Sequence, residues 1–254
     1  MDFGKVGVIG LGLIGGSIAK ALKQKGCFVA TVQSKSPDVA LAKKWIDQIF
    51  PTLKALLAEI DLLVIATPLS AILPIARKIK ADHKLLVIDV GSVKGLIVKE
   101  FEKLTKGNIE FLSTHPMAGT EKKGFEAADA ELFQNAPWII VPHKKNRTHI
   151  EPWIRSLGAK PIKMSADDHD QKTALVSHLP AMISKALLRF VKAQDPSSLH
   201  IAGPGFQSMT RLAKGNPQLM TEIQRFNKKN LELVWKKWVA SLSERNQKKL
   251  QIKD

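Results

Sequence analysis

Short apolar runs alternate with amphipathic segments over the first 165 residues, and this alternation sets the expected fold. The runs are rich in β-branched residues and too continuous for half-exposed strands, so they predict a parallel sheet covered on both faces. They lie at residues 5–9, 28–32, 62–66, 85–90, 110–113 and 137–141. Segments of helical periodicity separate them, among them 17–25, 69–79 and 93–103.

The pattern changes near residue 165. Ser165, three residues before Asp168, is typical of a helix N-cap, and apolar residues then recur at helical spacing over 168–193 and 217–242. Asn216-Pro217 has the order with which helices begin. We therefore predict an α/β protein: a Rossmann-type, doubly wound, mostly parallel sheet over residues 1–165, followed by an all-α domain over 166–254.

A glycine-rich turn joins the first predicted strand to the first helix. It contains Gly10, Gly12 and Gly15 in the order and strand–turn–helix context of a dinucleotide-binding loop. Gly10 permits the tight turn, Gly12 lets the backbone approach a pyrophosphate, and Gly15 lets the helix pack on the strand. The helix N-terminus offers N–H groups to the phosphates, so we also include Leu13 and Ile14 in the predicted cofactor site. The alternative is a glycine turn that binds nothing.

The end of the second strand indicates which dinucleotide binds. NAD sites usually place an acid there for the ribose 2′-hydroxyl, whereas this chain has Ser34, Lys35 and Ser36 and no acid before Asp38. Two hydroxyls and an ammonium suit a 2′-phosphate, so we favour NADP. The alternative is an exposed turn in an enzyme that accepts NAD as well.

Other candidate residues lie where predicted strands end. Ligands of such sheets bind outside the carboxyl ends of the strands. Thr67 and Pro68 follow one strand and are expected to complete the cofactor site, while Ser92 and His115 follow or end two others.

Composition narrows the class of protein. The chain of 254 residues has one cysteine, Cys27, and no run of 18 apolar residues, so we expect a soluble cytoplasmic protein without a disulfide or a membrane partner. The seven histidines show no zinc-type spacing, and no metal is expected. The formal net charge is +16, but the basic residues recur as solvated helix faces without a nucleic-acid-binding module. We therefore expect no nucleic-acid partner.

Several motifs, in this order and spacing, carry a family resemblance. They are Gly10 to Gly15, Asp89-Val-Gly-Ser-Val-Lys94, His115-Pro-Met-Ala-Gly-Thr120, Asp168-His-Asp170, Ser177-His-Leu-Pro180, Gly205-Phe206, Thr210-Arg211 and Asn216-Pro217. Over nearly its full length the chain resembles the prephenate/arogenate dehydrogenases of tyrosine biosynthesis, and its motifs are most similar to the cyanobacterial-type arogenate dehydrogenases. The resemblance implies a homodimer formed through the helical domain. At this length we expect neither a chorismate mutase segment nor a regulatory domain.

The resemblance implies an oxidative decarboxylation and assigns residues to it. A cyclohexadienol loses a hydride and its hydroxyl proton, and carbon dioxide leaves as the ring becomes aromatic. By the resemblance His115 takes the proton, a role that suits a neutral imidazole, and Ser92 binds the same hydroxyl. The alternatives are a structural histidine and a serine that caps the next helix.

The resemblance also implies substrate contacts from the helical domain. Arg211 matches an arginine that grips a carboxylate, and His178 matches a second active-site histidine. We interpret His169 and Asp170 as supporting structure. A surface arginine and a packed histidine are the alternatives.

Substrate and cofactor choice stay open at this point. Asn135-Ala-Pro137 and the missing acid after the second strand favour arogenate with NADP, giving tyrosine. The alternative is prephenate with NAD or NADP, giving 4-hydroxyphenylpyruvate. Another two-domain NAD(P)-dependent reductase is more remote, because it would not be expected to have the His115 and Ser177-His178 segments together. A nucleotide-binding protein without catalysis is also more remote, because it would have no use for Ser92, His115 and Arg211.

Overall fold

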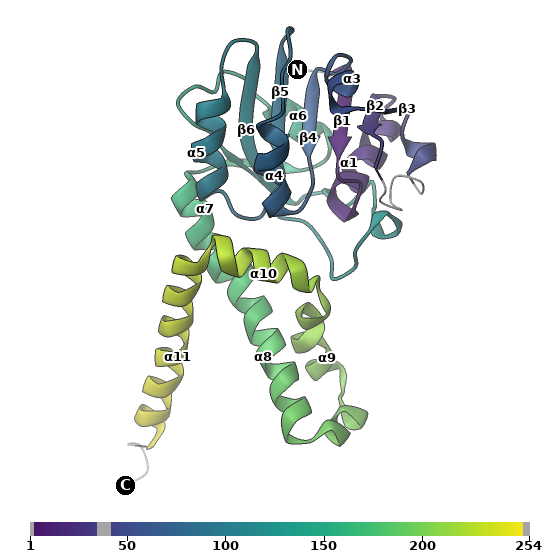
Figure 1. Cartoon of the computed structure of the whole chain (residues 1–254). Helices are drawn as coiled ribbons and strands as arrows, with labels where there is room; N and C mark the ends of the chain where they lie inside the picture. Colours follow the sequence, from purple (N-terminus) through teal and green to yellow (C-terminus); the bar gives the residue numbers. More distant parts are fainter. Residues whose placement is uncertain (1–2, 35–41, 251–254) are drawn as a thin grey trace. The chain divides into compact units, whose positions relative to one another are not determined.

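The computed structural model describes residues 3–34 and 42–250, except for the side chains of Lys43 and of residues 243–250. The chain divides into two compact units, Met1–His169 and Asp170–Asp254 (Figure 1). Each unit is described separately below.

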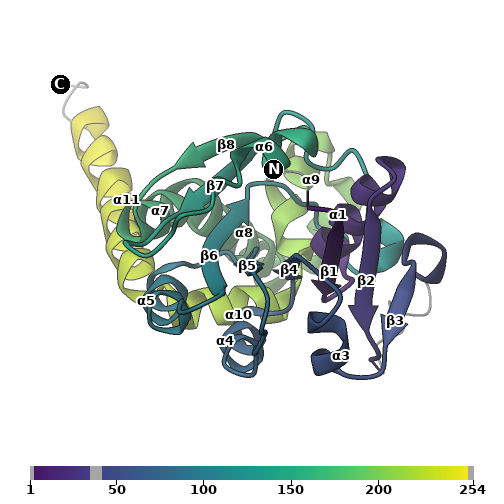
Figure 2. The same ribbon diagram turned by 90° about the horizontal axis from the view of Figure 1, so that it is seen from above.

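The first unit is built on an eight-stranded sheet in the order β3-β2-β1-β4-β5-β6-β7-β8 (Figure 2). All neighbouring strands are parallel except β6 and β7, which are antiparallel. The order runs outward in both directions from β1 and β4, so the predicted doubly wound, mostly parallel sheet is confirmed. The strands are β1 (Lys5–Ile9), β2 (Phe28–Val32), β3 (Gln48–Phe50), β4 (Leu62–Ile65), β5 (Leu85–Asp89), β6 (Ile109–Pro116), β7 (Pro137–Val141) and β8 (Lys160–Lys163).

Helices cover both faces of this sheet. Helices α4 and α5 lie together on one face, and α6 lies on the other (Figure 2). The first unit contains α1 (Leu13–Gln24), α3 (Leu53–Leu57), α4 (Leu69–Ala76), α5 (Gly95–Leu104), α6 (Glu151–Ser156), and the short 3-10 turns η1 (Lys43–Trp45) and η2 (Phe125–Ala127). Every residue of β4 and β5 is buried, and each fully buried leucine or isoleucine contributes about 1.5–3 kcal/mol to stability.

The register brings the strand ends to one edge of the sheet. Ile65 of β4 is paired with Ile9 of β1 on one side and with Asp89 of β5 on the other. Asp89 is in turn paired with Ser113 of β6. The segments that follow β1, β4 and β5, and the last residues of β6, therefore lie side by side.

Two strands were not predicted, and one is longer than predicted. β3 has only three residues, and β8 has the burial pattern of an exposed edge strand, so neither gives a long apolar run. β6 continues to Pro116 because the antiparallel β7 pairs with residues 113–116.

The second unit is helical, as predicted. Its elements are the end of α7 (Ala166–Thr173), a π-helical turn η3 (Ala174–His178), α8 (Leu179–Gln194), η4 (Pro196–Ile201), α9 (Pro204–Thr210), η5 (Arg211–Lys214), α10 (Pro217–Phe226) and α11 (Lys228–Leu250). The π turn precedes Pro180, which has no N–H for the carbonyl of Val176, so the regular α-helical ladder is interrupted there.

Both predicted helix caps are present. The Ser165 hydroxyl accepts a hydrogen bond from the Asp168 backbone N–H at 3.1 Å, and the Asn216 carboxamide accepts one from Gln218 N–H at 3.0 Å. Each satisfies a backbone donor that the first helical turn leaves without an intrahelical partner.

Much apolar surface of the second unit is exposed. Its described large apolar side chains with high exposure are Leu175, Val176, Phe190, Ile201, Met209, Leu212, Leu219, Leu233, Val239 and Leu242. By length and composition alone, the continuous helical stretch Ala166–Gln194 is apolar enough to cross a membrane, and 17% of its most apolar window is buried within the chain. Large apolar side chains exposed in this number favour a surface of the second unit that another molecule covers.

Candidate active site

The glycine turn after β1 has the geometry that a bound pyrophosphate requires. Gly10 has φ +93°, and a Cβ there would lie 2.5 Å from the Ala66 carbonyl oxygen. A Cβ on Gly15 would overlap the Gly10 carbonyl oxygen, so both positions need glycine for the turn itself. A Cβ on Gly12 would have no described atom within 4 Å, which leaves open space directly before the N-terminus of α1. A dinucleotide phosphate fits this combination.

The other predicted cofactor residues surround this turn to different extents. Leu13 and Ile14 form the first turn of α1 and are half-buried. Thr67 follows β4 and contacts the turn, since a Cβ on Gly10 would lie 2.9 Å from the Thr67 nitrogen. Pro68 is the N-cap of α4.

The end of β2 carries the predicted 2′-phosphate contacts. Ser34 is exposed just after the strand, whereas Lys35 and Ser36 lie outside the described residues. Asp47 anchors β2 by accepting hydrogen bonds from Val29 N–H at 2.8 Å and from the Lys23 ammonium at 2.6 Å. Burial alone would raise the pKa of Asp47, but these two hydrogen bonds outweigh it and hold the pKa below 3.8.

Ser92 lies in the segment after β5. Its hydroxyl oxygen is buried, and no hydrogen-bond partner for it exists in the part of the chain that the structure describes. Helix α5 begins at Gly95 with Lys94 at the N-cap position, so the alternative that Ser92 caps this helix is wrong. A buried hydroxyl without a partner costs free energy unless a bound molecule supplies the hydrogen bond.

His115 is half-buried near the end of β6, beside β5. Its Nδ1 lies 2.9 Å from Nε2 of His169, a fully buried residue of α7, and the two rings meet edge to face at 65°. One of these nitrogens must donate and the other accept. The partner of His115 Nδ1 is therefore a second imidazole, and the tautomer of one ring determines the tautomer of the other.

In the second unit, His178 belongs to the π turn and is only 1% exposed. The Asn227 carboxamide nitrogen donates to the Asp170 carbonyl oxygen at 2.8 Å and lies 3.3 Å from Nδ1 of His178. A carbonyl oxygen can only accept, so it fixes the orientation of the amide. The amide then donates to Nδ1 as well, which leaves the proton of a neutral His178 on Nε2.

Sequence reasoning did not single out Asn227, because no motif surrounds it. Arg211, which it did single out, is exposed at the start of η5. Among the described residues, no group of three or more His, Cys, Asp or Glu side chains is arranged to hold a metal ion.

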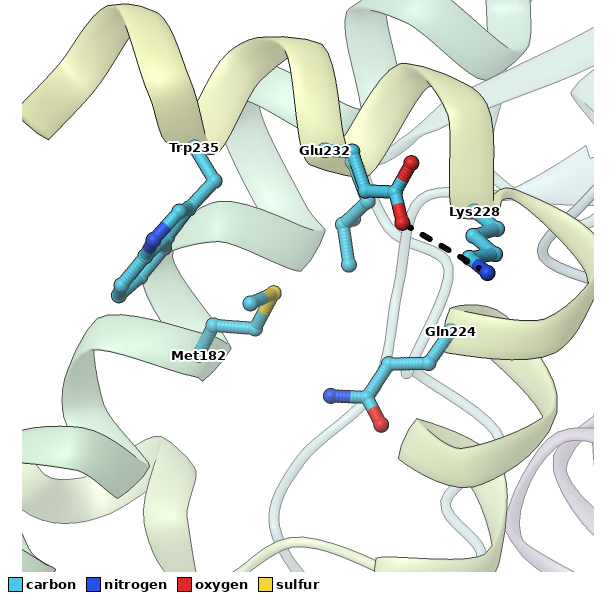
Figure 3. Close-up of a pocket in the computed structure, with 6 residues that line it drawn as sticks. Met182, Gln224, Lys228, Glu232 and Trp235 are labelled. Carbon is cyan, nitrogen blue, oxygen red and sulfur yellow. Dashed lines mark ion pairs between the residues drawn. The ribbon is translucent and has the colours of Figure 1, made fainter.

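A pocket of about 270 Å³ lies among α8, α10 and α11 (Figure 3). Met182 and Trp235 form part of its apolar wall, and Lys228 and Glu232 form an ion pair of 3.7 Å at its edge (Figure 3). His178 and Arg211 do not line it. We therefore do not assign the pocket to the substrate.

Two family models match the chain. One, described as prephenate dehydrogenase, nucleotide-binding domain, matches residues 18–160. The other, described as prephenate dehydrogenase, dimerization domain, matches residues 165–250.

Individual relatives agree with these matches. The cyclohexadienyl dehydrogenase of Zymomonas mobilis is 32% identical over 256 residues, which cover 94% of this chain and 86% of that protein. The prephenate dehydrogenases of Bacillus subtilis and Lactococcus lactis are longer, and the matched regions cover 67% and 64% of their lengths.

Two solved structures are similar over nearly the whole chain. Synechocystis arogenate dehydrogenase is 30% identical with a TM-score of 0.75, covering 96% of this chain and 93% of that one. Prephenate dehydrogenase from A. aeolicus, in complex with hydroxyphenyl propionate and NAD+, is 26% identical with a TM-score of 0.84, covering 99% and 92%.

Proposed function

Because the chain belongs to the prephenate dehydrogenase family, we propose that it converts arogenate to tyrosine by oxidative decarboxylation, with NADP as the hydride acceptor. The second candidate is the conversion of prephenate to 4-hydroxyphenylpyruvate with NAD or NADP. The main support is the Ser92 hydroxyl, which is buried and has no hydrogen-bond partner in the described part of the chain. Ser92 follows β5, and the neighbouring strand β6 carries His115.

The nicotinamide cofactor supplies the acceptor for the hydride that leaves the hydroxyl-bearing carbon. The glycine turn from Gly10 to Gly15 and Thr67 would hold the cofactor, and Ser34 would contact its ribose 2′-phosphate. From the sequence alone, Lys35 and Ser36 are assigned to the same phosphate. The Ser92 hydroxyl binds the substrate hydroxyl and orients the ring. His115 takes the hydroxyl proton and returns it to the phenolic oxygen after carbon dioxide has left, so the proton balances.

His169 sets the tautomer that this role requires. To accept a proton at Nε2, a neutral His115 must carry its own proton on Nδ1. The 2.9 Å hydrogen bond then runs from His115 Nδ1 to Nε2 of His169, which must have its proton on Nδ1. The same hydrogen bond ties the His115 ring to a fully buried residue.

We assign the carboxylate contacts of the substrate to Arg211 and His178. The planar guanidinium of Arg211 can donate two parallel hydrogen bonds to a carboxylate. The donor–acceptor pattern at Asn227 leaves His178 with an Nε2–H donor, which suits a carboxylate or carbonyl oxygen.

The preference for arogenate and NADP rests on the sequence at two places. No acid follows β2 before Asp38, which favours a 2′-phosphate, and Asn135-Ala-Pro137 is similar to the cyanobacterial-type enzymes. The similarity to solved structures of both an arogenate and a prephenate dehydrogenase supports the oxidative decarboxylation, but it does not favour one substrate over the other.

The test is a spectrophotometric assay of cofactor reduction with all four pairs of substrate and cofactor. We expect the largest kcat/KM with arogenate and NADP. A larger value with prephenate would favour the second candidate, and the absence of activity on both substrates would refute the proposal.

We further propose that the protein acts as a homodimer in the cytoplasm. The dimerization domain that matches residues 165–250 carries the exposed apolar side chains of the second unit. Light scattering of the purified protein tests the oligomeric state, and a monomer at micromolar concentration would contradict it.

A further inference from the structure

A fully buried ion pair lies at the ends of the strands that carry the candidate catalytic residues. The side chains of Asp89 and Lys94 are both 0% exposed, and Lys94 Nζ lies 2.5 Å from Asp89 Oδ2. Lys94 Nζ also donates to the Ser113 hydroxyl at 3.1 Å and to the Thr114 carbonyl oxygen at 2.6 Å. An ammonium has three N–H donors and no acceptor, so these three bonds use its capacity.

The Asp89 carboxylate completes the network. It accepts hydrogen bonds from the Gly91 backbone N–H at 2.8 Å and from the Ser113 hydroxyl at 2.6 Å. The Thr114 hydroxyl donates to the Asp89 carbonyl oxygen at 2.7 Å. The end of β5, the segment after it and the end of β6 are thus connected through side chains as well as through the sheet.

The bonded groups flank both candidate catalytic residues. Gly91 precedes Ser92, and Lys94 follows it by two positions; Thr114 directly precedes His115. We propose that Lys94 is a positioning residue, whose buried ammonium holds the Ser92 hydroxyl and the His115 imidazole in their relative places. The inference rests on the proposed function.

Stability alone does not explain this pair. Removing two charges from water costs free energy that their attraction only partly returns, so an apolar pair of the same shape is often as stable or more stable. Such a pair could not donate to the Thr114 carbonyl oxygen, which lies immediately before His115. Because the three hydrogen bonds of its ammonium described above all go to protein oxygens, Lys94 is not assigned a proton-transfer or cofactor-binding role.

The test separates stability from placement. Lys94→Met leaves Asp89 charged and buried, so we expect a lower Tm. The double variant Asp89→Asn, Lys94→Met removes both charges, and we expect its Tm to return to within a few degrees of wild type. In the double variant, kcat should still be at least 30-fold below wild type, while the Kd for NADP changes less than threefold. Lys103→Met, which removes an exposed lysine of α5, is the matched control and should leave Tm, kcat and the Kd for NADP close to their wild-type values.

Recovery of kcat together with Tm in the double variant would overturn the proposal and leave Lys94 a structural residue. If the double variant does not fold, Ser113→Ala answers the question instead. It removes one acceptor of Lys94 and one donor to Asp89 without removing a charge, so we expect a lower Tm and, measured well below that Tm, a three- to tenfold loss of kcat. An unchanged kcat in Ser113→Ala would then overturn the proposal.

A second readout does not depend on turnover. The imidazole nitrogen shifts of His115, followed by NMR in the protein without substrate, should move in the double variant and stay constant in Lys103→Met. Unmoved shifts would refute the positioning role. If wild type had no dehydrogenase activity on either substrate, the proposed function would fail, while the NMR result would still decide whether Lys94 places His115.

Discussion

Replacement of Gly12 by alanine separates a ligand-binding glycine from a structural one. Gly12 has φ −74° and ψ −156°, which an alanine can adopt, and its Cβ would meet no described atom within 4 Å. Alanine lowers the conformational entropy of the unfolded chain, which stabilises the fold, but it is a poorer N-cap than glycine, which destabilises it. Because the two effects oppose each other, the free energy of unfolding should change by less than about 1 kcal/mol. We expect a Tm shift of at most roughly 4 °C.

Cofactor affinity should fall much more. A methyl group on Gly12 occupies the space proposed for the pyrophosphate and disrupts one charge-assisted hydrogen bond, worth roughly 1.5–3 kcal/mol. This corresponds to a Kd for NADP that is roughly 10- to 150-fold higher, measured by fluorescence titration or calorimetry. Gly203→Ala is the matched control, because Gly203 is also an extended N-cap glycine with open space around its Cβ.

Gly15→Ala gives the opposite result. Its Cβ would overlap the Gly10 carbonyl oxygen and lie 2.9 Å from the Ala66 Cβ, so the turn must shift and Tm should fall. The reasoning is refuted if Gly12→Ala binds NADP and NAD as tightly as wild type, or if Gly203→Ala weakens binding equally.

Three further predictions concern neighbouring parts of the molecule. Asp47→Asn should lower Tm at pH 7. Because the folded pKa of Asp47 is depressed, the stability that it contributes is present above the unfolded value of 3.8. The difference from wild type should shrink as pH falls below 3.8, and a constant difference would contradict it. Asn227→Leu removes a donor to His178, and we expect roughly a fivefold rise in the substrate KM, equivalent to about 1 kcal/mol, at unchanged Kd for NADP; an unchanged KM would exclude this support of His178. Ser34→Asp should lower the ratio of NADP to NAD affinity at least tenfold because a carboxylate repels the 2′-phosphate, and an unchanged ratio would remove Ser34 from the cofactor site.

The fold was largely predictable because its central strands are buried on both faces. Leu62–Ile65 and Leu85–Asp89 are uninterrupted buried runs, which leave a periodicity that single-sequence reasoning can detect. The edge strand Lys160–Lys163 is mostly exposed and contains a proline, so its pairing with β7 is a tertiary effect that its own sequence does not indicate.

The candidate site was predictable only as far as the ends of strands. Ser92 and His115 follow from the rule that ligands bind at carboxyl ends of parallel strands and from the family resemblance. Their supporting contacts join residues far apart in sequence: His115 and His169 are separated by 54 positions, and His178 and Asn227 by 49. Neither separation corresponds to a helical or strand period, so no local pattern could have predicted these hydrogen bonds.

His115→Asn tests the central claim most directly. Asparagine cannot take the hydroxyl proton at neutral pH, and general base catalysis by a histidine contributes typically about 10²–10⁴-fold to the rate. We predict that kcat for NADP reduction with arogenate decreases by about 10²–10⁴-fold, while the Kd for NADP stays within about threefold of wild type. A kcat close to wild type, measured in a variant of unchanged Tm, would contradict the assignment of His115 as the base.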